Sequence, residues 1–172
     1  LKAAEHGAVA VVKKKASDES NTNYAQGGIA AVMDPDDDIE AHVRDTLVAG
    51  AGLCDEAVVR FVVTEGPERV RELIALGAEF DREDDGDLHL GREGGHSANR
   101  IVHAADATGR EVERALLAAV QAHPNIHIYD FHFALELLTE HHLGMRVRQL
   151  PDIHCFGAYV LNEETEEVVE RV

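Results

Sequence analysis

A polar, glycine-containing segment between residues 20 and 30 has the clearest potential for ligand binding in this sequence. It reads Ser-Asn-Thr-Asn-Tyr-Ala-Gln-Gly-Gly-Ile-Ala. The adjacent Gly27 and Gly28 leave backbone N–H groups without covering side chains, so a flat or phosphorylated ligand can lie against them. Further donors and acceptors come from amide and hydroxyl side chains, those of Asn21, Thr22, Asn23 and Gln26. The residue types alone are equally compatible with a plain polar turn.

A second segment with chemical potential runs from His89 to Arg110. It contains Arg92, His96, Arg100 and His103, with only Glu93 and Asp106 of opposite sign. The whole chain of 172 residues has 16 Lys and Arg against 33 Asp and Glu, a formal net charge of −17. Local positive charge in so acidic a chain predicts a binding face for a dicarboxylate. Glu93 can then pair with a substrate ammonium group, or with Arg92 or Arg100 on a solvated loop.

Three histidines, His89, His96 and His103, recur every seven residues. The adjacent glycines Gly94 and Gly95 interrupt any helix that would align them, and no ligand pair four residues apart stands out. We therefore predict no metal site. The only two cysteines, Cys54 and Cys155, make no disulfide framework, which is typical of a reduced, cytoplasmic protein.

The composition excludes several classes of function. The acid excess argues against nucleic acids and anionic membranes as partners, because both require a basic surface. No apolar run approaches the ~20 residues of a membrane span, and no secretion signal is visible. A non-catalytic acidic interaction module, in which the glycine pair is only a turn, stays an alternative.

The elements that must position these residues alternate between strand and helix. We predict strands over residues 8–14, 126–133, 134–140, 145–147 and 156–161, a final hairpin strand over 166–172, and a hairpin over 79–90. We predict helices over 39–49, 55–65, 67–76 and 109–122. Asp55 caps the second helix, Pro67 lies in the first turn of the third, and Thr108 and Glu111 form a capping box for the fourth. The order predicts an α/β class, with a βαβ framework, a helical insertion and a small antiparallel β-meander.

Two motifs resemble one known superfamily. Ala25-Gln-Gly-Gly-Ile29 resembles the flavin-contacting loop of the succinate dehydrogenase, fumarate reductase and L-aspartate oxidase superfamily. The wider segment from Ser20 to Val32 is most similar to the L-aspartate oxidase family. Glu93-Gly-Gly-His-Ser97 and His103-Ala-Ala-Asp-Ala-Thr-Gly-Arg-Glu111 are similar to the same family over a long run.

The resemblance implies a partial FAD-binding, Rossmann-like domain over residues 1–172. The family's first strand, its Gly-x-Gly-x-x-Gly turn and its capping domain are missing, so we expect a fragment of a longer protein. In the membrane-associated members a His at the position of Asn21 tethers the flavin, so the resemblance implies non-covalent FAD here. It implies cofactor contacts from Lys14, Asn21, Thr22, Asn23, Tyr24, Ala25, Gln26, Gly27, Gly28, Ala134 and Leu135. A dinucleotide fold independently favours Lys14, at a strand end that meets the adenosine ribose.

The resemblance also implies an activity. The whole enzyme would oxidise L-aspartate to iminoaspartate by hydride transfer to FAD, with O2 or fumarate as electron acceptor, as the first step of NAD biosynthesis. Quinolinate synthase is an expected partner. Glu93 would recognise the substrate ammonium, while the main base would lie outside this chain, so we expect the isolated chain to be inactive. A soluble fumarate reductase or succinate dehydrogenase flavoprotein is the alternative enzyme.

Overall fold

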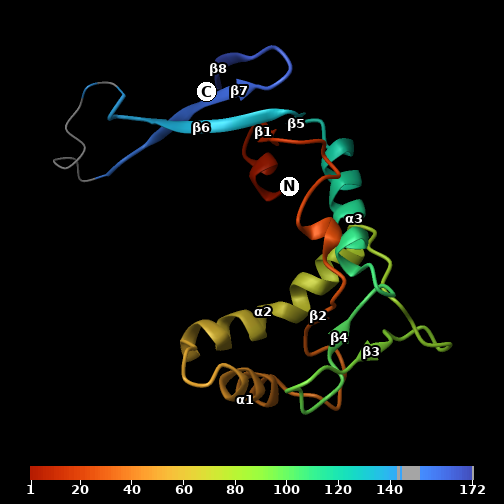
Figure 1. Cartoon of the computed structure of the whole chain (residues 1–172). Helices are drawn as coiled ribbons and strands as arrows, with labels where there is room; N and C mark the ends of the chain where they lie inside the picture. The colour runs from red at the N-terminus through yellow and green to blue at the C-terminus, as the bar shows by residue number, and fades with distance from the viewer. Residues whose placement is uncertain (143, 145–151, 172) are drawn as a thin grey trace. The chain divides into compact units, whose positions relative to one another are not determined.

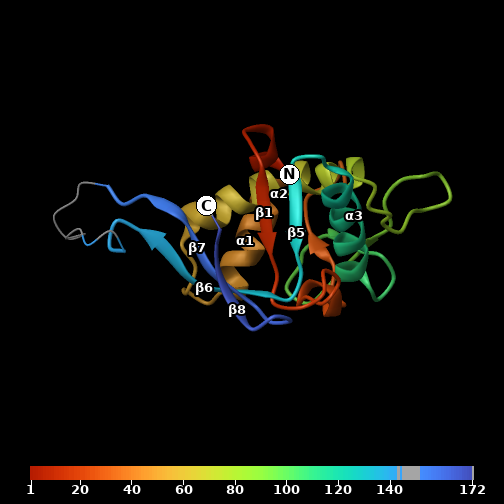
Figure 2. The same cartoon turned by 90° about the horizontal axis from the view of Figure 1, so that it is seen from above.

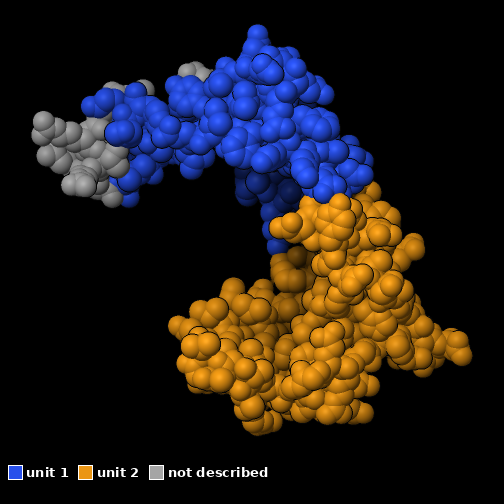
Figure 3. Space-filling model, viewed as in Figure 1, with its two compact units in different colours: residues 1–19, 120–172 blue, residues 20–119 orange. Residues whose placement is uncertain are grey.

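The structure, a computed structural model, describes residues 1–142, 144 and 152–171. The chain folds into two compact units, one of residues 1–19 with 120–172 and one of residues 20–119, which Figure 3 colours separately. The predicted strand 145–147 lies outside the described residues. Within the described ranges, no helix combines the length and the apolar character needed to cross a membrane.

A parallel strand pair begins the first unit. Strand β1 (Val9–Val12) pairs with β5 (Ile126–Tyr129), from Val9 opposite Ile126 to Val12 opposite Tyr129. Figures 1 and 2 show the two strands side by side although more than a hundred residues separate them. Parallel pairing requires a long crossover connection. Here the connection contains the whole of the second unit. The predicted strands 8–14 and 126–133 are therefore confirmed, in shorter form.

An antiparallel meander follows in the same unit. Strands β6 (His132–Thr139), β7 (Cys155–Asn162) and β8 (Glu167–Arg171) pair in the order β6-β7-β8. The predicted meander is confirmed, but the predicted break after residue 133 is wrong. The chain instead turns at Phe131, whose φ of 57° ends β5 and lets β6 begin at His132.

The second unit contains a small sheet in the order β2-β4-β3. Its strands are β2 (Ile29–Ala30), β3 (Leu90–Gly91) and β4 (Ile101–Val102), and β4 pairs antiparallel with both neighbours. The buried core behind the sheet consists of Ala31, Val70, Ala78, Phe80, Val102 and Ala115. This sheet matters for function because the chain enters β2 directly from the Asn21–Gly28 segment and leaves β3 directly before Glu93.

Two helices of the second unit begin at aspartates, of which Asp55 was predicted as a cap. The Asp38 carboxylate accepts a hydrogen bond of 2.8 Å from the Ala41 amide and caps α1 (Ile39–Ala49). The Asp55 carboxylate accepts one of 2.9 Å from the Ala57 amide and caps α2 (Glu56–Ala75). Each cap satisfies a backbone donor that the helix itself leaves unpaired. Both predicted starts are confirmed.

Helix α2 corrects the prediction of two separate helices over 55–65 and 67–76. It runs without interruption from Glu56 to Ala75 with Pro67 inside it. Val63, Pro67 and Val70, spaced by four and three residues, form one buried stripe along the helix. Burial of this stripe on both sides of the proline outweighs the lost backbone hydrogen bond, which would otherwise end a helix.

Helix α3 (Thr108–Ala122) forms where predicted, but the side chains of its first turn have other hydrogen-bond partners than predicted. Thr108 is already helical, and its Oγ1 accepts a hydrogen bond of 3.1 Å from the Ala104 amide. The Glu111 carboxylate accepts from the Glu79 amide at 2.6 Å and from Arg114 Nε at 2.8 Å. The predicted capping box is therefore wrong, because both side chains bind other partners: Thr108 binds the preceding Ala104 amide, and Glu111 binds the distant Glu79 amide.

Candidate functional site: the Asn21–Gly28 loop and the Glu93 loop

The segment from Asn21 to Gly28, called the flavin loop below after the family resemblance of its sequence, is fixed from behind by helix α3. The amide of Gly109, in the first turn of α3, donates a hydrogen bond of 3.0 Å to the carbonyl oxygen of Ala25. A Cβ atom at Gly109 would lie 1.9 Å from the Thr22 carbonyl oxygen. The loop backbone thus approaches the helix as closely as a glycine permits, and the N-terminal helix donors fix its path.

The two adjacent glycines of the flavin loop have different environments. A Cβ atom at Gly28 would lie 2.2 Å from Ile101 Cγ2 and 2.6 Å from the Val102 carbonyl oxygen, so Gly28 is required for packing against β4. A Cβ atom at Gly27 would meet no described heavy atom within 4 Å. Gly27 therefore leaves an open, side-chain-free surface on a loop that is held from behind. This arrangement fits a flat ligand ring lying against the backbone.

Ser20 supplies an anchor that sequence reasoning missed. Its hydroxyl donates a hydrogen bond of 2.7 Å to Glu113 Oε2 on α3 and accepts one of 3.3 Å from the Asn23 amide. Glu113 is 9% exposed, so this contact joins the start of the loop to a buried carboxylate. The only signal in the sequence was an acid on the otherwise apolar side of a helix.

The Asn21 side chain makes no capping hydrogen bond to the short 3₁₀-helix Thr22–Tyr24, and Asn21 is exposed.

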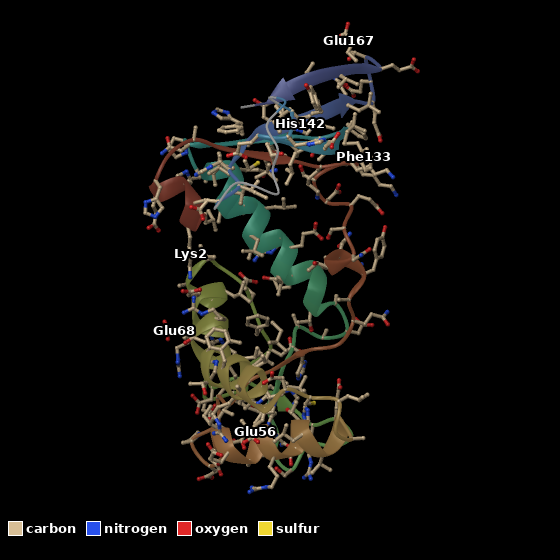
Figure 4. All side chains as sticks on the ribbon, turned by 90° about the vertical axis from the view of Figure 1, so that its left-hand side faces the viewer. Lys2, Glu56, Glu68, Phe133, His142 and Glu167 are labelled. Atoms are coloured by element: carbon tan, nitrogen blue, oxygen red, sulfur yellow. The ribbon has the colours of Figure 1, made fainter. Side chains whose placement is uncertain are left out.

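Three predicted cofactor contacts, Lys14, Ala134 and Leu135, belong to the first unit. Lys14 Nζ lies 5.0 Å from the ring centroid of Phe133, a cation–π geometry (Figure 4 labels Phe133). Ala134 pairs with Val160, and the register shifts before Glu136, which leaves Leu135 at a β-bulge. Leu135 is 48% exposed.

The connection between β3 and β4, residues 92–99, is called the Glu93 loop below. Its base is closed by a hydrogen bond of 3.0 Å from the Arg100 amide to the Gly91 carbonyl oxygen. Its tip is tightened by a bond of 3.2 Å from the His96 amide to the Glu93 carbonyl oxygen and one of 2.9 Å from Arg92 Nε to the His96 carbonyl oxygen. Glu93 itself is exposed at this tip, as a residue that meets a substrate must be.

Arg100 corrects two predictions. Its side chain is completely buried and forms ion pairs of 2.7 Å with both Asp37 and Asp45. Burial by itself would lower the pKa of Arg100, but the hydrogen bonds to the two carboxylates outweigh that effect and raise the pKa. The stretch from His89 to Arg110 is therefore not one exposed basic face, and Arg100 is already neutralised by partners other than Glu93.

The three evenly spaced histidines separate into two places. His89 and His103 lie with ring nitrogens 3.0 Å apart, and His103 Nδ1 lies 3.0 Å from an Asp81 oxygen. His96 instead meets the buried His42, with ring centroids 5.9 Å apart. Across residues 1–142, 144 and 152–171, no group of three or more His, Cys, Asp or Glu side chains has the arrangement of a metal site.

A concavity of about 340 Å³ lies beside the Glu93 loop. Its walls are the C-terminal half of α1, Cys54, and the residues Gly94, Gly95 and His96. The pocket is smaller than a typical cofactor site but has the scale of a small organic acid. The loop that bears Glu93 thus borders a cavity on its α1 side.

Comparison with known proteins identifies the kind of domain. The family described as FAD binding domain matches residues 1–172. The chain is a member of this family. This membership confirms the predicted α/β FAD-binding domain and the predicted cofactor class.

Curated relatives agree with the resemblance noted in the sequence. The chain is 59% identical over 169 residues to L-aspartate oxidase 2-a, chloroplastic, from Nicotiana tabacum, covering 98% of this chain and 25% of the relative. It is 47% identical over 173 residues to L-aspartate oxidase from Vibrio cholerae, covering 98% and 31%. The chain thus spans about a quarter to a third of the length of these relatives. Similarity to the L-aspartate oxidase family is confirmed.

A solved structure shows the same fold. The E. coli quinol fumarate reductase superposes with a TM-score of 0.85 at 29% identity, covering 98% of this chain and 27% of that one. The chain therefore has the fold of a segment of this fumarate reductase.

Proposed function

We propose that this chain is part of an L-aspartate oxidase, an enzyme that oxidises L-aspartate to iminoaspartate with non-covalently bound FAD. The observation that carries the proposal is the identity of 59% over 98% of the chain with a protein of that name. The open loop at Gly27 and the exposed Glu93 on one small sheet support it.

The residues of this chain would hold the cofactor at two places. The flavin loop would lie against the ring, with the open backbone at Gly27 as contact surface and with Asn21, Thr22, Asn23, Tyr24, Ala25, Gln26 and Gly28 around it. Lys14, Ala134 and Leu135 would serve the adenosine side. When bound, FAD supplies the acceptor for the hydride that leaves the substrate Cα. Asn21 has an amide where a tethering imidazole would be needed, so binding is non-covalent.

Glu93 would recognise the substrate amine. Its carboxylate is exposed, and the buried Arg100 is engaged with Asp37 and Asp45, so Glu93 is available to a cationic ligand. A charge-assisted hydrogen bond to the ammonium group of L-aspartate favours this substrate over succinate, which has no amine. The group that removes the amine proton would belong to the remainder of the protein, so the isolated chain would be inactive.

The wider role follows from this reaction. Dioxygen or fumarate would accept the electrons, the product would enter NAD biosynthesis, and quinolinate synthase would be a partner that receives it. We propose a cytoplasmic location from the reduced cysteines and the acidic composition, whereas the tobacco relative is named as chloroplastic.

Substitution of Glu93 in the whole protein tests the proposal. We expect Glu93→Gln to raise the KM for L-aspartate on the order of tenfold or more, because a charged hydrogen bond of about 1.5–3 kcal/mol is lost. Asp84→Asn, at an exposed residue in the turn enclosed by the isolated β-bridge between Arg82 and Leu88, is the matched control and should leave the KM unchanged. Succinate oxidation that exceeds L-aspartate oxidation, with no effect of Glu93→Gln, would instead establish the alternative of a succinate or fumarate enzyme.

A further inference from the structure

The Glu93 loop is anchored to helix α1 through one carboxylate oxygen. Asp45 Oδ2 accepts hydrogen bonds of 2.7 Å from the Ser97 amide, 2.7 Å from the Ser97 hydroxyl and 2.7 Å from Arg100 Nη1. Ser97 lies four residues after Glu93, and Asp45 lies 52 residues before Ser97 in the chain. One oxygen on a rigid helix therefore collects three donors, two of them from the loop that carries Glu93.

Arg100 holds that carboxylate in place from the buried side. Its guanidinium is 0% exposed and uses Nε and Nη2 for two hydrogen bonds to Asp37, at 2.8 and 2.7 Å. The same Nη2 lies 3.4 Å from the Ser97 hydroxyl. The planar fork of arginine fixes direction as well as distance, so Asp45 cannot follow Ser97 outward without breaking a buried ion pair.

The protonation of Asp45 agrees with this geometry. The pKa of Asp45 is lowered to about 2. The largest causes of this decrease are the hydrogen bonds from the Ser97 hydroxyl and amide, and Arg100 contributes to it as well. The carboxylate is thus fully ionised at neutral pH, which makes the bonds to Ser97 charge-assisted.

We propose that Ser97 and Asp45 are positioning residues that hold Glu93 at the distance needed for the substrate ammonium. Ser97 fixes the outgoing side of the loop to α1, as the Arg100 amide fixes its base to Gly91. Loss of this anchor leaves the Glu93 carboxylate chemically unchanged but allows it a wider range of positions. Because recognition of a charged group depends on geometry within a fraction of an ångström, the result is weaker binding of the amine. The inference rests on the proposed role of Glu93.

A double-mutant cycle in the whole FAD-loaded protein tests the inference. We expect Ser97→Ala to raise the KM for L-aspartate about tenfold with kcat changed less than about twofold. In the Glu93→Gln background, Ser97→Ala should add less than about a twofold increase, because a residue that acts only through Glu93 has nothing further to position. Competitive inhibition by succinate, which has no amine, should be unchanged in both single variants.

Two further variants complete the test. Asn99→Ala, an exposed position in the same loop, is the matched control and should leave the KM for L-aspartate unchanged. Asp45→Asn should reproduce the effect of Ser97→Ala on the KM, since a neutral amide cannot replace the charged acceptor.

The outcomes separate the inference from the proposed function. If Glu93→Gln leaves the KM for L-aspartate unchanged, the proposed role of Glu93 fails. If Glu93→Gln raises the KM while Ser97→Ala has no effect, or has the same effect in both backgrounds, the positioning role is overturned. An equal loss of L-aspartate and succinate binding in Ser97→Ala would also overturn it, because a general structural defect affects both.

Discussion

The amide of Gly109 and the carbonyl oxygen of Ala25 are joined by a hydrogen bond of 3.0 Å that fixes the flavin loop to the first turn of α3. At the same place a Cβ atom on Gly109 would lie 1.9 Å from the Thr22 carbonyl oxygen and 2.8 Å from the Ala25 carbonyl oxygen. Both neighbours are backbone atoms, which cannot move aside as a flexible side chain can. The absence of a side chain at residue 109 is therefore a condition for the shape of the loop.

We expect Gly109→Ala to displace the flavin loop and destabilise the whole protein by up to about 3 kcal/mol, the cost of overpacking. The clash exceeds the gain of about 1 kcal/mol that alanine normally gives inside a helix. Thermal unfolding and the FAD content of the purified protein measure the two effects. Gly7→Ala is the matched control, because a Cβ atom there meets no described heavy atom within 4 Å. Unchanged stability and FAD content in Gly109→Ala would contradict the interpretation.

Asn21 leads to a prediction about how FAD is held. An amide side chain cannot form the covalent bond that a histidine makes at this position in the tethered members of the superfamily. We expect all of the flavin to leave the protein on acid precipitation and to appear in the supernatant, where its absorbance is measured. Yellow colour that stays with the washed precipitate would show a covalent attachment and refute the prediction.

The buried ion pairs of Arg100 predict a large effect on stability. Arg100→Met leaves Asp37, which is 2% exposed, and Asp45 without their cation, and we expect a loss of about 3–5 kcal/mol in the free energy of unfolding. Arg60→Met removes the exposed pairs with Glu40 and Glu56, which solvent screens, and should cost much less stability than Arg100→Met. Denaturant unfolding of both variants measures the difference. Similar losses of unfolding free energy in the two variants would show that the buried ion pairs contribute no more to stability than the exposed ones.

The low pKa of Asp45 predicts how stability depends on pH. Its pKa is about 2 in the folded protein, below the value of about 3.9 for an unfolded chain, so the carboxylate favours the folded state. This contribution is complete above pH about 4 and is lost as the pH falls toward 2. We expect the Tm difference between wild type and Asp45→Asn to be constant from pH 7 to 5 and to shrink below pH 4. A difference that stays constant down to pH 2 would contradict this assignment.

Features whose causes lie close together in the sequence were predictable. Asp55 caps the helix that begins at the next residue, and the meander of β6, β7 and β8 joins strands that are consecutive in the chain. The loop over residues 20–30 was selected as a candidate from its residue types, but its assignment to flavin came from the family resemblance and stays a prediction.

Features that depend on distant partners were not predictable from local patterns. Pro67 continues α2 because a buried stripe extends on both sides of it, and Glu111 leaves its expected cap to bind the Glu79 amide. Arg100 looked like part of a basic face, yet its partners Asp37 and Asp45 lie 63 and 55 residues away. The contacts that hold the two candidate loops, such as those of Ser20 and Asp45, were missed for this reason.

The Glu93 loop is fastened at its base and on one flank, while Glu93 at its tip is exposed and accepts a hydrogen bond from the His96 amide through its carbonyl oxygen. Replacement of the tip side chain therefore leaves the backbone attachments intact. Under the proposed role of Glu93, variation at residue 93 would alter the charge preferred in a ligand at little cost in folding, and would make this position a point of divergence between enzymes that oxidise amines and enzymes that act on plain dicarboxylates.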